Sequence, residues 1–210
     1  MLEKAEDLEV KLKACQVDPS NQEKNAAVKT ALYHIIGQGI VAARNAIIER
    51  SKQEEHEVRD YSTTLIFALV KKFDFGYFIA SYSVGDGAVA LHKKDTYVKT
   101  LLDPDGGEFA GQTRFITMSE IIESADIWKR IRFEFNNDFT SLFLMTDGVS
   151  DPVFETDSNL LKTELWDKMY ADISEKVTFG AADSGQQLAE WLDFWSQGNH
   201  DDRTIAVLTR

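Results

Sequence analysis

One short stretch of this chain, residues 141–151, constrains the fold more than any other. It reads S-L-F-L-M-T-D-G-V-S-D, so a run of apolar and β-favouring residues stops at Asp147 and Gly148. Such a run predicts a buried strand. A carboxylate at the end of a buried strand must be solvated, capped or paired with a cation. We therefore expect an acidic group at the edge of the core.

A second apolar stretch, residues 204–208 near the C-terminus, also follows acidic residues. Asp201 and Asp202 precede it. Two core strands with aspartates at their ends can direct two carboxylates at one point, and carboxylate oxygens are the ligands that a hard divalent cation prefers. The two stretches together predict a metal site at the edge of the core.

The coarse pattern of the chain changes near residue 58. Before it, apolar residues recur every three or four positions in residues 2–16 and 22–53, which predicts two helices separated by a turn. After it come short β-branched and aromatic runs with Gly or Asp turns, which are typical of an antiparallel sheet. Helices followed by strands and then by more helices predict the α+β class.

The second part of the chain is expected to hold short strands and three helical segments. The strand at residues 131–135 alternates apolar and charged residues, and we expect it to pair with residues 141–146 across a turn. Residues 119–126 are expected to form a helical turn capped by Ser119. The other predicted strands are residues 61–70, 77–84, 88–92, 96–102, 114–117 and 204–208, and the later helices are residues 160–177 and 186–197.

Charge, cysteine content and the lengths of apolar runs indicate which partners and which cell compartment to expect. The formal net charge is −12, and nucleic-acid phosphates bind clustered Lys and Arg, so we expect no nucleic-acid partner. Cys15 is the single cysteine, so no internal disulfide can form, which suits a reducing compartment. No apolar run reaches the about 20 residues that cross a bilayer, and the acidic start is unlike a signal peptide. We expect a cytoplasmic protein without a membrane partner.

Five aspartates lie at predicted strand ends or turns: Asp86, Asp147, Asp151, Asp201 and Asp202. Aspartate is common in turns because it bonds to its own backbone, and for any one of the five alone that explanation is the simpler one. Asp147 and Asp201 differ from the others, because each lies beside a strongly apolar strand. These two are the best candidates for metal ligands.

Four motifs, taken in order, carry a family resemblance. They are Y-S-T-T-L-I-F-A-L at 61–69, Y-S-V-G-D-G-A-V-A-L at 82–91, D-G-V-S-D at 147–151 and H-D-D-R-T-I-A-V-L at 200–208. Their order and spacing resemble the metal-dependent protein phosphatases, the protein phosphatase 2C family, with its Thr-Thr strand, Gly-Asp hairpin, Asp-Gly-x-x-Asp motif and final Asp motif. The resemblance implies a β-sandwich of antiparallel sheets flanked by helices.

The resemblance also implies roles for single residues. Asp147 and Asp201 would hold one Mn²⁺ or Mg²⁺, and Asp86 and Asp151, with Asp147, would form a more labile metal site. The implied activity is hydrolysis of phosphoserine or phosphothreonine in a phosphoprotein by a metal-activated water. Asp202 stands where many relatives have Asn, so it is expected to support the ligands rather than to bind metal.

Gly148, like Asp202, is expected to support the metal ligands rather than to bind the metal.

The chain departs from the family pattern at its start, where relatives carry two strands, a phosphate-binding Arg and an Asp that bridges two metals. Nothing in residues 1–60 resembles them, so we expect a single partial domain over residues 1–210, helical at 1–58 and built of sheet and helices at 59–210. The alternative function is a phosphatase-like interaction or regulatory domain that is catalytically inactive, because the bridging Asp is missing.

Other features have simpler explanations than a ligand site. G-Q-G-I-V-A at 37–42 mimics a dinucleotide fingerprint, but no strand is predicted before it, and its small residues suit close helix packing. His200 is interpreted as a loop histidine rather than as an acid–base catalyst, and D-P-D-G-G-E at 103–108 as a turn rather than a calcium loop. An aromatic cluster predicts where the last helices pack, or else an exposed partner surface: Trp166, Tyr170, Trp191, Phe194 and Trp195.

Overall fold

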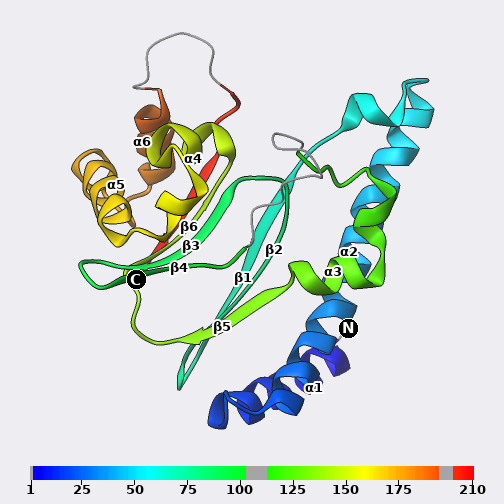
Figure 1. The fold of residues 1–210 in the computed structure, drawn as a ribbon, viewed down its shortest axis with the longest axis horizontal. Coiled ribbons are helices and arrows are strands. Elements are labelled where there is room, and N and C mark those ends of the chain that lie inside the picture. Colours follow the sequence, from blue (N-terminus) through cyan, green and yellow to red (C-terminus); the bar gives the residue numbers. More distant parts are fainter. Residues whose placement is uncertain (1, 103–112, 194–200) are drawn as a thin grey trace. The chain divides into compact units, whose positions relative to one another are not determined.

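The computed structural model describes residues 2–102, 113–193 and 201–210, which fall into two compact units. The first unit combines residues up to Gly85 with the later segment that ends at Asn137, and the second begins at Asp86 and resumes at Asp138. Each unit contains one antiparallel sheet with helices (Figure 1). The predicted mixture of antiparallel sheets and helices is confirmed, while the assignment of all 210 residues to a single domain stays a prediction.

The sheet of the first unit has the strand order β1-β2-β5. Strands β1 (Leu65–Phe73) and β2 (Gly76–Val84) form a hairpin, and β5 (Arg132–Asn136) pairs with the other edge of β2. The central strand β2 is therefore the one whose side chains are almost all buried. Central strands lose solvent on both sides, which explains its apolar sequence.

Two helices form the N-terminal part of this unit, as predicted. They are α1 (Leu2–Val17) and α2 (Gln22–Gln53), and Asn21 caps α2 by accepting the Lys24 amide at 3.1 Å. One side of α2 packs on the β2 face of the sheet, because its apolar residues recur at helical spacing. The packed side chains are Val28, Leu32, Ile36 and Ile40 of α2 and Phe78, Ala80, Tyr82 and Val84 of β2.

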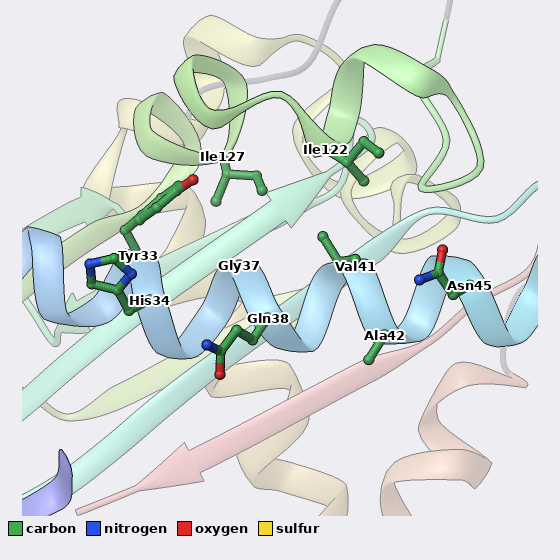
Figure 2. Close-up of a pocket in the computed structure, with 9 residues that line it drawn as sticks. All are labelled: Tyr33, His34, Gly37, Gln38, Val41, Ala42, Asn45, Ile122 and Ile127. Atoms are coloured by element: carbon green, nitrogen blue, oxygen red, sulfur yellow. The ribbon is translucent and has the colours of Figure 1, made fainter.

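The small residues at 37–42 lie in the middle of α2, so no strand precedes them and the helix interpretation is confirmed. A Cβ atom on Gly37 would lie 3.7 Å from Cδ1 of Ile127, in ordinary contact with helix α3 (Ser124–Arg130). A pocket of about 420 Å³ opens beside this contact, and Figure 2 shows Tyr33, Val41 and Ile122 among the side chains around it. None of the five candidate aspartates lines it.

A buried ion cluster ties α3 to the sheet of the first unit. Asp126 accepts from Arg130, at 2.5 Å, and from Lys129, at 2.7 Å, and Arg130 also donates to the carbonyl of Ser83 in β2 at 3.0 Å. Burial opposes ionisation of Asp126, but hydrogen bonds and attraction from Arg130 and Lys129 outweigh it and lower the pKa of the carboxyl group. Two short 3₁₀ helices, η1 (Val58–Tyr61) and η2 (Ser119–Ile122), complete the unit's helical segments among the described residues.

The sheet of the second unit has the order β4-β3-β6-β7. Its strands are β3 (Ala88–Lys93), β4 (Tyr97–Thr100), β6 (Ser141–Met145) and β7 (Ile205–Thr209), all antiparallel to their neighbours. Helices α4 (Asp147–Phe154), α5 (Thr163–Lys176) and α6 (Ser184–Leu192), with the 3₁₀ helix η3 (Asp157–Leu161), lie on one face of this sheet (Figure 1).

Aromatic side chains fill the space between those helices and the sheet. Trp166 of α5 and Trp191 of α6 are fully buried in the same core as Phe143 of β6, and Tyr170 packs against it. The prediction that these aromatics mark where the late helices pack is confirmed for Trp166, Tyr170 and Trp191. Phe194 and Trp195 lie outside the described residues, as do His200 and residues 103–108.

The predicted pairing of residues 131–135 with residues 141–146 is wrong. β5 pairs with β2, whereas β6 lies between β3 and β7 in the other sheet. Phe133 and Phe135 of β5 pack against Phe78 of β2, while β6 is too buried to serve as one arm of an exposed hairpin. A short polar turn between two strands does not select their partners, because strand pairing depends on which faces can be buried.

Several element boundaries also differ from the predictions. Residues 114–117 form no strand, since Ile116 donates to the carbonyl of Thr63 from a turn. The helical pattern at 160–177 is interrupted at Lys162, whose extended backbone separates η3 from α5. Ser119 begins η2 rather than capping it. Apolar spacing continues through such breaks, so periodicity alone does not detect them. Among the helices of the described residues, none is both long and apolar enough to cross a membrane.

Candidate functional site

The strand β6 leads directly into helix α4, and this junction carries two of the candidate aspartates. Asp147 is the first residue of α4 and Asp151 lies one turn later. The prediction that these two residues lie at strand ends or turns is wrong, because both belong to a helix. Residues four positions apart lie on the same face of a helix, so the helix places the two carboxylates side by side. A negative charge in the first turn is also favoured by the helix dipole.

The pairing of β6 with β7 brings the C-terminal motif to the same junction. Met145 pairs with Ile205, and Thr146 donates its amide to the carbonyl of Thr204 at 3.0 Å. Residues 201–204, which we call the strap, therefore run beside the first turn of α4. Asp201 and Asp202 lie on the strap and are exposed. The antiparallel register explains why two motifs more than 50 residues apart in the sequence meet here.

The strap approaches α4 so closely that only glycine fits at position 148. A Cβ atom there would lie 2.5 Å from the carbonyl oxygen of Asp202 and 3.1 Å from that of Asp201. Real Cβ atoms essentially never come so near to backbone, so any larger residue would push the strap away from α4. Gly148 thus determines how near the Asp201 backbone can come to Asp147.

Asp86 reaches the same end of the sheet through β3. It lies in the turn between β2 and β3, directly after Gly85, whose φ of +111° is a conformation that favours glycine. β3 begins at Ala88, which pairs with Met145 at the end of β6. The turn that carries Asp86 is therefore a neighbour of the β6–α4 junction.

The four carboxylates interact electrostatically. Burial raises the pKa of Asp147, and the negative charges of Asp86, Asp201 and Asp151 raise it further, although the Gly148 amide has the opposite effect. Burial also raises the pKa of Asp151, followed by the charges of Asp86 and Asp157. The main causes of these two shifts among the described residues are burial and neighbouring carboxylates rather than attraction from a Lys or Arg. The site therefore concentrates the negative charge of several carboxylates in one region.

The hydrogen bonds of Asp147 and Asp201 follow the same pattern. Oδ1 of Asp147 accepts the amide of Gly148 at 2.8 Å, and Oδ1 of Asp201 accepts the amide of Asp202 at 2.8 Å. Within the described part of the chain, Oδ2 of each carboxylate has no hydrogen-bond donor. Each carboxylate is thus oriented through one oxygen and keeps the other available.

The donor chemistry of this site fits a hard divalent cation, because all the candidate ligands are carboxylates and their charges repel one another. The geometry is more open than a preformed metal centre. Among the described residues, no three His, Cys, Asp or Glu side chains converge closely enough to hold a metal ion. The structure thus brings the candidate aspartates into one charged region without forming a closed coordination shell.

Two features of this region were not found by sequence reasoning. Helix α4 has only eight residues, too few to give a helical period, and Pro152 lies inside it. Thr146 contacts the strap through its side chain, since its hydroxyl donates to the carbonyl of Asp202 at 3.1 Å and accepts the amide of Thr204 at 3.0 Å. The only signal in the sequence is its place directly before the Asp-Gly pair.

The family match with known proteins includes the first three of the four motifs. The sequence model of a family described as protein phosphatase 2C matches residues 7–193. Nine chains of solved structures match, among them a bacterial serine phosphatase that carries a point mutation, with 18% sequence identity and a TM-score of 0.45 over 90% of this chain and 68% of that one. No curated protein matches. The family match covers most of the 210 residues of this chain, so the chain belongs to the protein phosphatase 2C family.

Proposed function

We propose that this chain is a metal-dependent phosphoprotein phosphatase that hydrolyses phosphoserine or phosphothreonine. Asp147 and Asp201 would hold one Mn²⁺ or Mg²⁺, and Asp86 and Asp151 would share a second, more labile ion with Asp147. Such ions, when bound, lower the pKa of a water molecule enough for it to attack a phosphate ester. Family membership supports a phosphoprotein as the substrate.

The observation that carries this proposal is the gathering of four carboxylates at the β6–α4 junction, where burial and three neighbouring carboxylates raise the pKa of Asp147. A carboxylate in that position destabilises the fold when it is ionised and nothing balances its charge. A bound divalent cation would supply the missing positive charge and occupy the available Oδ2 atoms. The carboxylates' own contribution is to attract the cation and to orient it through side chains fixed by the Gly148 and Asp202 amides.

The test is hydrolysis of phosphothreonine and phosphoserine peptides by the 210-residue chain with and without Mn²⁺. We expect activity that requires Mn²⁺ and that Asp147→Asn abolishes. Asp167→Asn is the matched control, because Asp167 binds His92 in the same unit and is none of the candidate ligands. A wild-type chain that binds Mn²⁺ with high affinity and yet hydrolyses no phosphopeptide would contradict the enzyme proposal.

A second candidate function is a phosphatase-like interaction or regulatory domain without catalysis. The observation that favours it is the open arrangement of the carboxylates. Within the described residues, no three of them lie close enough together to hold a metal ion. A Mn²⁺ titration by calorimetry separates the two proposals. Two high-affinity sites support the enzyme, whereas one weak site without hydrolysis supports the interaction domain.

A further inference from the structure

We infer that the hydroxyl group of Thr146 is a positioning group that holds the strap, and with it Asp201, beside Asp147. The inference rests on the proposed function, because it assigns Thr146 a part in setting the affinity for the divalent cation. Thr146 itself would not bind the cation. It would act on the backbone that carries one of the ligands.

The contacts of Thr146 join three segments of the second unit. Its backbone follows β6 and precedes α4, and its carbonyl accepts the amides of Val149 and Ser150, each at 3.0 Å. Its hydroxyl donates to the carbonyl of Asp202 at 3.1 Å and accepts the amide of Thr204 at 3.0 Å. One residue therefore fixes both the first turn of α4 and the strap.

A hydroxyl group is needed for this arrangement, because it can donate one hydrogen bond and accept another at the same time. The strap reads Asp201, Asp202, Arg203 and Thr204, and all of these except the half-buried Arg203 are exposed. The Arg203 side chain donates to the carbonyl of Leu192 at 2.6 Å, which links the strap to the end of α6 but not to the first turn of α4. Its contact with Gly148 is a close approach rather than a bond. Among the described residues, the Thr146 hydroxyl is the one side-chain group that bonds to the strap backbone on both sides of Arg203.

The position of the strap should affect how strongly the cation binds, because the strap carries Asp201. Asp201 is exposed, and its carboxylate must stay near Asp147 for both to contact one ion. Residues that orient metal ligands without binding the metal typically change metal affinity by about 10–100-fold when mutated. Losing the Thr146 hydroxyl should therefore weaken cation binding, while excess cation should restore most of the activity.

The experiment compares Thr146→Val, which keeps the shape but loses the hydroxyl, with Thr146→Ser, which keeps the hydroxyl. Thr140→Val is the matched control. Thr140 lies at the opposite end of β6, and its hydroxyl also accepts a backbone amide, that of Lys94 at 3.0 Å. Four quantities are measured in the 210-residue chain and its variants: the Kd of Mn²⁺ by calorimetry, kcat and KM at saturating Mn²⁺, and the rate of hydrogen exchange of the Thr204 amide without metal.

We expect Thr146→Val to raise the Kd of Mn²⁺ by roughly 10–100-fold and to speed exchange of the Thr204 amide. Thr146→Ser and Thr140→Val should leave both near the wild-type values, and kcat of Thr146→Val should recover when Mn²⁺ saturates. An unchanged Kd in Thr146→Val would overturn the inference and leave the phosphatase proposal intact.

If the wild type binds no Mn²⁺, the phosphatase proposal fails, and the exchange rates alone then judge the role of Thr146. Faster exchange of the Thr204 amide in Thr146→Val than in Thr146→Ser would support the hydroxyl as the anchor of the strap. Equal rates in the two variants would overturn that role.

Discussion

Gly148 offers the sharpest test of the close approach between helix α4 and the strap. Alanine at this position would place a Cβ atom 2.5 Å from the carbonyl oxygen of Asp202. Carbon and carbonyl oxygen rarely come nearer than about 3.3 Å, so the backbone must move by roughly 0.8 Å. Strain of this kind in packed structure typically costs about 1–3 kcal/mol. The atoms that must move belong to the backbone of Asp201 and Asp202.

The matched control is Gly185→Ala. Gly185 is the second residue of α6, as Gly148 is of α4, but no atom lies within 4 Å of the position its Cβ would take. Both variants gain the same helix propensity, up to about 1 kcal/mol. The difference between the two free energies of unfolding therefore measures the steric cost, for which we expect about 1–3 kcal/mol.

Urea unfolding followed by tryptophan fluorescence provides the assay, because Trp166 and Trp191 are buried in the core of the same unit. A calorimetric titration of Gly148→Ala with Mn²⁺ should also show weaker binding than in the wild type, since the strap has moved. Equal free energies of unfolding for Gly148→Ala and Gly185→Ala would refute the reasoning, because they would mean that the strap yields without cost.

Two further predictions concern charges. Asp126→Ala should destabilise the fold by about 3–5 kcal/mol in urea unfolding, because it leaves the buried guanidinium of Arg130 without its carboxylate. The control is Glu9→Ala, which removes the exposed ion pair with Lys13 and should leave the urea midpoint almost unchanged. Similar losses of stability in both variants would contradict this prediction. Because the pKa of Asp147 is raised, the metal-free folded state binds more protons than the unfolded chain. The free energy of unfolding therefore falls as pH rises from the ordinary pKa of the carboxyl group, 3.8, through the raised pKa. Without metal, Asp147→Asn should therefore unfold at higher urea concentration than the wild type at neutral pH, and the difference should vanish at pH values below the ordinary pKa; a less stable variant at neutral pH would contradict the assignment.

Local patterns predicted much of the secondary structure. The two long N-terminal helices follow from apolar spacing and the Asn21 cap, and both are present. The strands β2, β3 and β6 lie within about two residues of their predicted bounds, since each is a short apolar run that ends at turn residues. Helix α4 was missed, because eight residues that begin with Asp-Gly and contain Pro have no helical signature.

Strand partners could not be read from the sequence. The half-apolar pattern of β5 fits either neighbour, and the choice of β2 depends on Phe78, Phe133 and Phe135 packing together. Phe78 lies more than 50 positions from the other two, so no local rule relates it to them. The same limit applies to the breaks at Lys162 and Glu123, where apolar spacing continues although the helix does not.

The sequence by itself determined which residues are candidates for binding a cation, because an aspartate beside an apolar strand is recognisable from neighbouring residues alone. It also determined the family, through four motifs in order. Only the tertiary structure decided how these residues meet. The β6–β7 register brings the strap to the first turn of α4, where Gly148 leaves room for it and the Thr146 hydroxyl bonds to it. Such contacts arise from chain segments distant in sequence, which local patterns do not specify.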